Sequence, residues 1–225
     1  KWVRDHCTVP PLKKGSAPNS ETADDRGEML GQSFLDTMTI AKEQECPLYT
    51  DDFGTKMLAQ NDFGVAGFWT QVMLMAALAD KQVSEEEHND AVLELIRLKY
   101  RHTTISGQVI LYAAKKSNWS NTDRFAEVLE TLRGTQMELR SAIGVLVEFM
   151  FMLWQQPILD FQRDTPVMAA LDVLADQRDD RVVVRIMRIA VTARFRMAPL
   201  TESRVQQVIS AWEALRMKPG MIGLQ

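Results

Sequence analysis

The hydrophobic positions after residue 67 recur at helical spacing, and short polar, glycine or proline segments separate one run from the next. Apolar residues three and four positions apart are typical of amphipathic helices. The helices predicted in this way cover residues 68–79, 84–99, 106–116, 121–133, 136–154, 165–177, 179–196 and 201–217. The expected breaks between them include 117–120, Gly134, Pro157, Pro166 and Pro199. No repeat of fixed period is visible, which favours an irregular helical bundle over a regular solenoid.

The pattern ahead of residue 68 is different and predicts a small α/β unit. Residues 35–41 indicate a helix that opens with Asp36, and a short turn then leads to Pro47. Residues 47–50 form a short apolar run, typical of a buried strand, which ends in two adjacent carboxylates, Asp51 and Asp52. The segment 64–67 predicts another strand, with glycine permitting a close approach of the backbone.

These patterns divide the chain into three parts. Residues 1–20 contain prolines and glycine without an apolar period and are predicted to form an irregular arm. Residues 21–83 are predicted to form a partial α/β unit with a parallel sheet, and residues 84–225 an all-α helical domain, so that the whole is predominantly helical. The chain begins with Lys1. We therefore expect it to be the ordered part of a longer protein.

Composition and charge narrow the class of protein. Hydrophobic residues make up 46% of the chain and charged residues 25%, as in soluble globular proteins. The longest apolar run, 142–154, contains Glu148 and is shorter than the ~20 residues that a membrane span needs, so no membrane association is expected. Two cysteines without metal or disulfide spacing favour the cytoplasm. Residues 1–83 hold 8 basic and 12 acidic side chains, whereas the remainder holds 18 of each.

The carboxylates of the first part suggest a metal site. In open α/β sheets ligands gather beyond the carboxyl ends of strands, and Mg²⁺ or Mn²⁺ prefers oxygen ligands. Asp36, Asp51 and Asp52 are therefore predicted to converge on such an ion, with metal-assisted attack on a phosphodiester as the expected chemistry. The residues alone leave another interpretation open. Asp36 can favour the dipole of its helix, and Asp51-Asp52 can cap the helix that follows.

Residues 30–70 resemble the second half of a PIN domain. The resemblance is carried by 35–41, by Pro47-Leu48-Tyr49-Thr50-Asp51-Asp52-Phe53-Gly54, and by the segments 57–59 and 64–67. Within this family, the segment is similar to PIN-like domains appended to large bacterial multidomain proteins. PIN domains are largely Mg²⁺- or Mn²⁺-dependent ribonucleases with four clustered acids. The resemblance implies that Asp36 and Asp52 are catalytic metal ligands and that Asp51 is an accessory ligand. The aspartate and glutamate that complete the family's set are expected upstream of Lys1 or on another chain, and the alternative is a degenerate site.

Two functions follow as hypotheses. The first is an RNA endonuclease that uses the acidic cluster, with the helical part binding substrate or partner. The second is a non-catalytic interaction module, in which a PIN-like remnant anchors a helical platform for a protein partner or for the rest of a larger polypeptide. No zinc motif, glycine-rich phosphate loop or serine nucleophile motif points to another chemistry.

A basic helix is the candidate binding surface for RNA or a partner. It carries five arginines with no acid among them: Arg181, Arg185, Arg188, Arg194 and Arg196. The buried face of the same helix is predicted to hold Val182, Val183, Ile186, Ile189 and Ala190. The alternative is a solvated face in which the arginines pair with neighbouring acids, namely Asp172, Asp176, Asp179 and Asp180.

Overall fold

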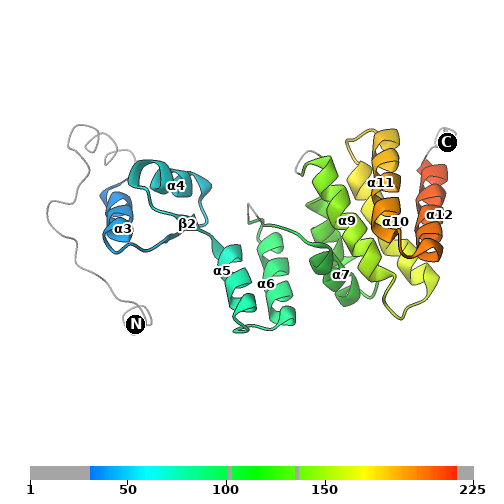
Figure 1. Cartoon of the computed structure of the whole chain (residues 1–225), viewed down its shortest axis with the longest axis horizontal. Coiled ribbons are helices and arrows are strands. Elements are labelled where there is room, and N and C mark those ends of the chain that lie inside the picture. The colour runs from blue at the N-terminus through cyan, green and yellow to red at the C-terminus, as the bar shows by residue number, and fades with distance from the viewer. Residues whose placement is uncertain (1–30, 101–102, 135–136, 217–225) are drawn as a thin grey trace, which may run out of the picture. The chain divides into compact units, whose positions relative to one another are not determined.

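The computed structural model describes residues 31–100, 103–134 and 137–216 (Figure 1). The chain divides into two compact units between Gln82 and Val83, next to the boundary expected after residue 83. The predicted arm, 1–20, lies outside the described residues. Among the helices of the described ranges, none is both long and apolar enough to cross a bilayer.

The first unit pairs a small parallel sheet with short helices. Its elements are α3 (Gln32–Glu43), β1 (Leu48–Tyr49), α4 (Phe53–Leu58), the π-helical turn η1 (Ala59–Phe63), β2 (Gly67–Phe68) and α5 (Thr70–Ala79). The two strands run parallel, with Leu48 opposite Gly67 and Tyr49 opposite Phe68, which confirms the predicted parallel pairing. Apolar residues of α3 pack on those of β1 and η1 to form its core: Leu35, Met38, Ala41, Leu48, Ala59, Phe63 and Val65.

Gly67 is required where β2 passes α4. A Cβ atom at this position would lie 2.6 Å from Cγ of Lys56, closer than real Cβ contacts come. The predicted close approach of the backbone in this segment is therefore confirmed, and it allows β2 to reach its register with β1.

The described part of the second unit is helical, as predicted. Its helices are α6 (Glu85–Arg97), α7 (Gly107–Lys116), α8 (Asp123–Glu130), α9 (Leu139–Leu153), α10 (Asp160–Ala175), α11 (Asp180–Phe195) and α12 (Pro199–Arg216). At the start of α6, Ser84 and Glu87 form a capping box, in which each side chain accepts a hydrogen bond from the other's backbone N–H. The box fixes the first turn of the unit.

The break predicted at Pro166 is wrong, because this proline lies inside α10. A proline within a helix removes one backbone hydrogen bond and costs about 3 kcal/mol. The apolar face around it offsets this cost, since Val167, Ala170 and Leu171 are completely buried. Pro199, by contrast, is the first residue of α12, where the missing N–H has no helical partner to lose.

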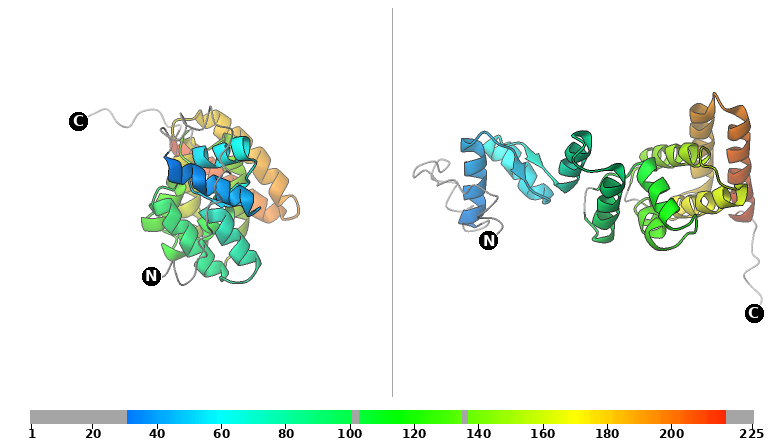
Figure 2. Two further views of the ribbon diagram at one scale, coloured as in Figure 1. Left: turned by 90° about the vertical axis from the view of Figure 1, so that its left-hand side faces the viewer. Right: turned by 90° about the horizontal axis from the view of Figure 1, so that it is seen from below.

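The helices of the second unit stack in two rows (Figures 1 and 2). In one row α6 packs on α8, α8 on α10 and α10 on α12, and in the other α7 packs on α9 and α9 on α11. Contacts from the α8 region to α10 and from α10 to α12 join residues 40 to 46 positions apart, as between Arg133 and Asp176 and between Trp212 and Asp172, whereas α6 meets α8 through Glu94 and Arg124, 30 positions apart. Such spacing is typical of helical repeat arrays, in which each pair packs on its neighbours. The predicted irregular bundle misses this regularity.

One glycine allows α7 and α9 to cross closely. A Cβ atom at Gly107 would lie 2.5 Å from the backbone nitrogen of Phe149. Phe149 itself is fully buried and contacts Phe125 of α8, with ring centroids 6.2 Å apart. The crossing therefore places three helices around one aromatic centre.

Candidate functional site

Asp36 lies one turn into α3 rather than at its start. The helix begins at Gln32, whose side-chain Nε2 donates a hydrogen bond of 2.7 Å to Asp36 Oδ1. Asp36 is half-buried, next to the buried Leu35. The prediction that it opens the helix is wrong by one turn, because the helical hydrogen-bonding pattern starts upstream of the apolar run.

Asp52 caps α4. Its Oδ1 accepts hydrogen bonds from the backbone N–H of Thr55 at 2.6 Å and from the Thr55 hydroxyl at 2.7 Å. Its own backbone N–H donates to Thr50 Oγ1. An aspartate in this position satisfies one of the unpaired N–H groups at a helix start. The capping interpretation of the Asp51-Asp52 pair is thus confirmed for Asp52.

Asp51 holds the start of α5. Its Oδ1 accepts from the backbone N–H of Thr70 at 2.9 Å, while its Oδ2 accepts from the Thr70 hydroxyl at 2.8 Å and from Tyr49 Oη at 3.0 Å. Partial burial is the largest single influence and raises the pKa of Asp51, but the three hydrogen bonds together outweigh it and bring the pKa below its usual value. The carboxylate therefore ties β1 to a helix 19 residues further along the chain.

These aspartates do not assemble a metal site by themselves. Within residues 31–100, 103–134 and 137–216, no three or more histidine, cysteine, aspartate or glutamate side chains gather in a group that could hold an ion. Both oxygens of Asp51 already accept hydrogen bonds. A cavity of about 220 Å³ lies beside α3 and β1, but none of the three aspartates lines it. The described residues thus do not fit Mg²⁺ or Mn²⁺ without further ligands.

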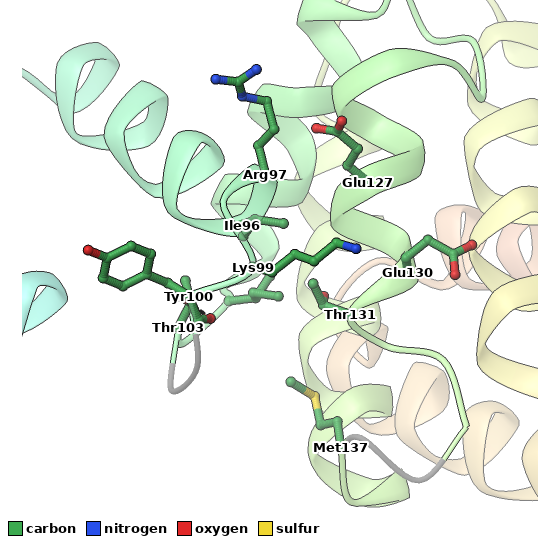
Figure 3. A pocket seen from close by; sticks show the side chains of 10 residues that line it. Ile96, Arg97, Lys99, Tyr100, Thr103, Glu127, Glu130, Thr131 and Met137 are labelled. Carbon is green, nitrogen blue, oxygen red and sulfur yellow. Dashed lines mark hydrogen bonds between the residues drawn. The ribbon is translucent and has the colours of Figure 1, made fainter. Parts of the chain in front are cut away.

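A larger cavity, of about 810 Å³, lies in the second unit, between the end of α6 with its following segment and α8 (Figure 3). Ile96 and Ile105, both buried, line it together with charged side chains of both signs. Figure 3 shows the Lys99 side chain reaching toward Glu130. Mixed charge favours no ligand of a single sign. Sequence reasoning missed this cavity because its walls are about 30 residues apart and share no motif.

The arginines of α11 divide into two groups. Arg188 donates to Glu213 and Ser210 on α12, and the guanidinium of Arg194 lies 3.6 Å from the ring centroid of Phe151 on α9. Arg181, Arg185 and Arg196 are exposed, and their side chains make no hydrogen bond or ion pair with any part of the chain that the structure describes. Only the second group is free to bind another molecule.

The alternative of a solvated face agrees with the exposure of Arg181, Arg185 and Arg196. Its pairing of the arginine side chains with neighbouring aspartates is wrong, because those aspartates bind elsewhere. Asp176 pairs with Arg133, Asp172 and Asp180 pair with Arg216, and Asp179 caps α11 through the N–H of Arg181 and Val182.

The predicted buried face of α11 also needs correction. The buried residues are Val183, Val184, Met187, Val191 and Phe195, whereas Val182 and Ile189 are 45% and 63% exposed. The helix carries apolar residues on two sides, so that periodicity alone does not decide which side is buried.

Comparison with known proteins bears on the first unit. No curated protein and no solved structure gives a significant match. Residues 1–61 match the model of a family described as the PIN domain associated with the TPR-GreAB-C-PIN system. The match includes α3, β1 and all three aspartates, and it extends upstream of the described residues. The beginning of this chain is therefore similar to a PIN domain, in agreement with the resemblance found in the sequence.

Proposed function

We propose that the chain is an interaction module, in which a PIN-like unit is joined to a helical-repeat platform that binds a protein partner. The observation that carries this proposal is the use of the two adjacent carboxylates. Asp51 and Asp52 each hold the start of a helix, and no metal-holding group forms among the described residues. Their roles are structural, so that they maintain the unit rather than leave a site open for chemistry.

The second unit supports the same proposal. Stacked helix pairs create an extended surface to which each repeat contributes side chains, and such arrays commonly serve as binding platforms. The family matched by residues 1–61 is named for its association with TPR and GreAB-C components. We infer that the partner belongs to such a multidomain system, either within the same polypeptide or as a separate protein.

The test is complex formation with those components. The full chain is mixed with the TPR and GreAB-C segments of its own system, and the molar mass of the mixture is measured by light scattering after size exclusion. A complex of defined stoichiometry is expected. The proposal is refuted if the components elute separately at concentrations well above the micromolar range.

RNA cleavage with Mg²⁺ or Mn²⁺ is the second candidate, and the match to a PIN domain favours it. A site with Asp36 and Asp52 would need further acidic ligands from outside the described residues. A divalent ion in such a site would activate water and offset charge on the scissile phosphate.

The Asp52→Asn variant separates the two candidates. Asparagine is also a good N-cap residue, and its oxygen can still accept from Thr55, so the fold should be retained while a ligand charge is removed. If the chain is a nuclease, wild type cleaves RNA only with Mn²⁺ or Mg²⁺, and Asp36→Asn and Asp52→Asn both lose the activity. Absence of cleavage by the wild type, or equal cleavage by these variants, counts against the nuclease.

A further inference from the structure

The helix α11 carries two apolar stripes, one of which is buried in the core while the other is largely exposed. The buried stripe runs along Val183, Val184, Met187, Val191 and Phe195. The second stripe consists of Val182, Ile186, Ile189 and Ala193, at positions i, i+4, i+7 and i+11. Val182 and Ile189 are 45% and 63% exposed, Ala193 is exposed and Ile186 is half-buried. Large aliphatic residues that recur at helical spacing on a largely exposed helix face are unusual on a protein surface.

Neighbouring helices leave Val182, Ile189 and Ala193 of this outer stripe exposed, while Ile186 packs partly against the core. On one side α12 contacts α11 through the pair Arg188–Glu213, and on the other side α9 contacts it through Phe151 and Arg194. The outer stripe faces away from the buried stripe and lies between these two contacts. It extends over eleven residue steps, or about 17 Å at the helical rise, which corresponds to about three turns of a partner helix.

The exposed arginines border the outer stripe on one side. At about 100° per residue, Arg181, Arg185 and Arg196 fall within about 60° of one another around α11, next to Val182 and Ile189. The acids that could neutralise them are bound elsewhere, as Asp176 is to Arg133 and Asp180 to Arg216. The surface therefore combines an apolar stripe with a positive border whose three arginines form no ion pair with any described residue.

We propose that this face of α11 binds an acidic amphipathic helix of a protein partner, an inference that rests on the proposed function. An apolar ridge on the partner would cover Val182 and Ile189, and carboxylates along its flank would meet Arg181, Arg185 and Arg196. Helix-in-groove recognition uses apolar anchors at this spacing, and complementary charge sets the orientation.

A protein helix fits the face better than RNA does. Single-stranded nucleic acid binds to basic grooves in which aromatic side chains stack on the bases. The exposed stripe is aliphatic, and the second unit as a whole carries as many acidic as basic residues from position 84 onward. The favourable free energy of removing aliphatic side chains from water is obtained only if the partner covers them with apolar groups.

A fluorescence anisotropy titration with a synthetic peptide tests the inference on the full chain. The probe is a labelled helical peptide of about 18 residues, with leucine at i, i+4, i+7 and i+11 and glutamate along one flank. Its controls are a scrambled peptide of the same composition, a version with lysine in place of glutamate, and a single-stranded RNA of similar length. Arg185→Glu and Ile189→Ser are compared with Lys42→Glu, which makes the same charge change on the exposed surface of α3.

The acidic amphipathic peptide is expected to bind the wild type with micromolar affinity. Arg185→Glu should weaken binding about tenfold and Ile189→Ser about three- to tenfold, whereas Lys42→Glu should have no effect. The lysine peptide should bind better to Arg185→Glu than to the wild type. Circular dichroism checks that the variants remain folded, as the exposure of both positions predicts.

Three results would overturn the inference: equal binding of the scrambled peptide, tighter binding of the RNA than of the peptide, or no effect of the α11 variants. Absence of peptide binding up to about millimolar concentration would do so as well. If the chain still forms its complex with the TPR or GreAB-C segments when Arg185 is changed to glutamate, the proposed function stands and only this surface is wrong. If the wild-type chain forms no complex with these segments, both the proposed function and this inference are refuted.

Discussion

Removal of the Asp51 carboxylate should loosen α5 without affecting the second unit. In Asp51→Ala the start of α5 loses an N–H acceptor and a nearby negative charge, and Tyr49 loses one of its hydroxyl partners. A lost helix cap costs about 1 kcal/mol, the charge at a helix start about 0.3–1 kcal/mol, and one further net hydrogen bond about 0.5–1 kcal/mol. Without the carboxylate, one of the two hydroxyl protons is free to join Tyr49 Oη and Thr70 Oγ1, which lie 2.7 Å apart, and this bond offsets part of the loss, so we expect a total of about 2 kcal/mol.

Hydrogen exchange measures this effect locally in the full chain. A loss of about 2 kcal/mol should speed the exchange of amides in α5 and β2 about 30-fold, because each 1.4 kcal/mol corresponds to a factor of ten. Asp51→Asn keeps an acceptor but loses the charge, and we expect about half of the effect. The matched control is Asp80→Asn at the C-terminal end of α5, which removes the same charge from an exposed position and should change exchange by about twofold or less.

The effect should also depend on pH in a defined direction. Because the folded-state pKa of Asp51 is lowered, its contribution is complete above the ordinary carboxyl pKa and is lost as the pH falls through the folded value. The difference between wild type and Asp51→Ala should therefore narrow below about pH 4. The reasoning is refuted if Asp51→Ala exchanges like Asp80→Asn, or if the difference stays constant between pH 6 and pH 3.

Further predictions concern packing in the second unit and can be checked by urea unfolding followed by circular dichroism. Gly107→Ala should lower the free energy of unfolding by about 2–3 kcal/mol because its Cβ would meet the backbone of Phe149, whereas Gly144→Ala, at an open position of α9, should raise it by about 0.5–1 kcal/mol. Equal effects of the two changes would contradict the close crossing. Trp212→Phe should cost about 1–2 kcal/mol, since the buried indole donates a 2.8 Å hydrogen bond to Asp172; an unchanged unfolding midpoint would show that this bond adds nothing.

Features encoded locally are those that the sequence reveals. The helix around residues 35–41, the short strand of Leu48 and Tyr49 and the capping box of Ser84 and Glu87 each depend on neighbours within a few positions. The capping role of Asp52 is local as well, and it was one of two interpretations that the residues left open. Such features can be predicted from the sequence because they do not depend on contacts with distant residues.

Features that depend on distant contacts could not be predicted. The partner of Asp51 is Thr70, and the rows of helices join residues 30 to 46 positions apart without any visible sequence repeat. On α11 two apolar stripes compete for the buried side, and only packing against α9 and α12 selects the one that contains Met187 and Val191. Pro166 shows the same limit, since tertiary burial outweighs its local tendency to end a helix.

The row arrangement of the second unit has a consequence for how it comes apart. Because each helix contacts mainly its immediate neighbours in the stack, loss of order at one end need not propagate through the whole. Detachment of α12 would expose Val205, Val208 and Ile209 and would leave the earlier helices packed on one another. Under heat or mechanical load this unit should therefore unravel in stages from its last helix, and shortened versions that end between helix pairs should remain folded.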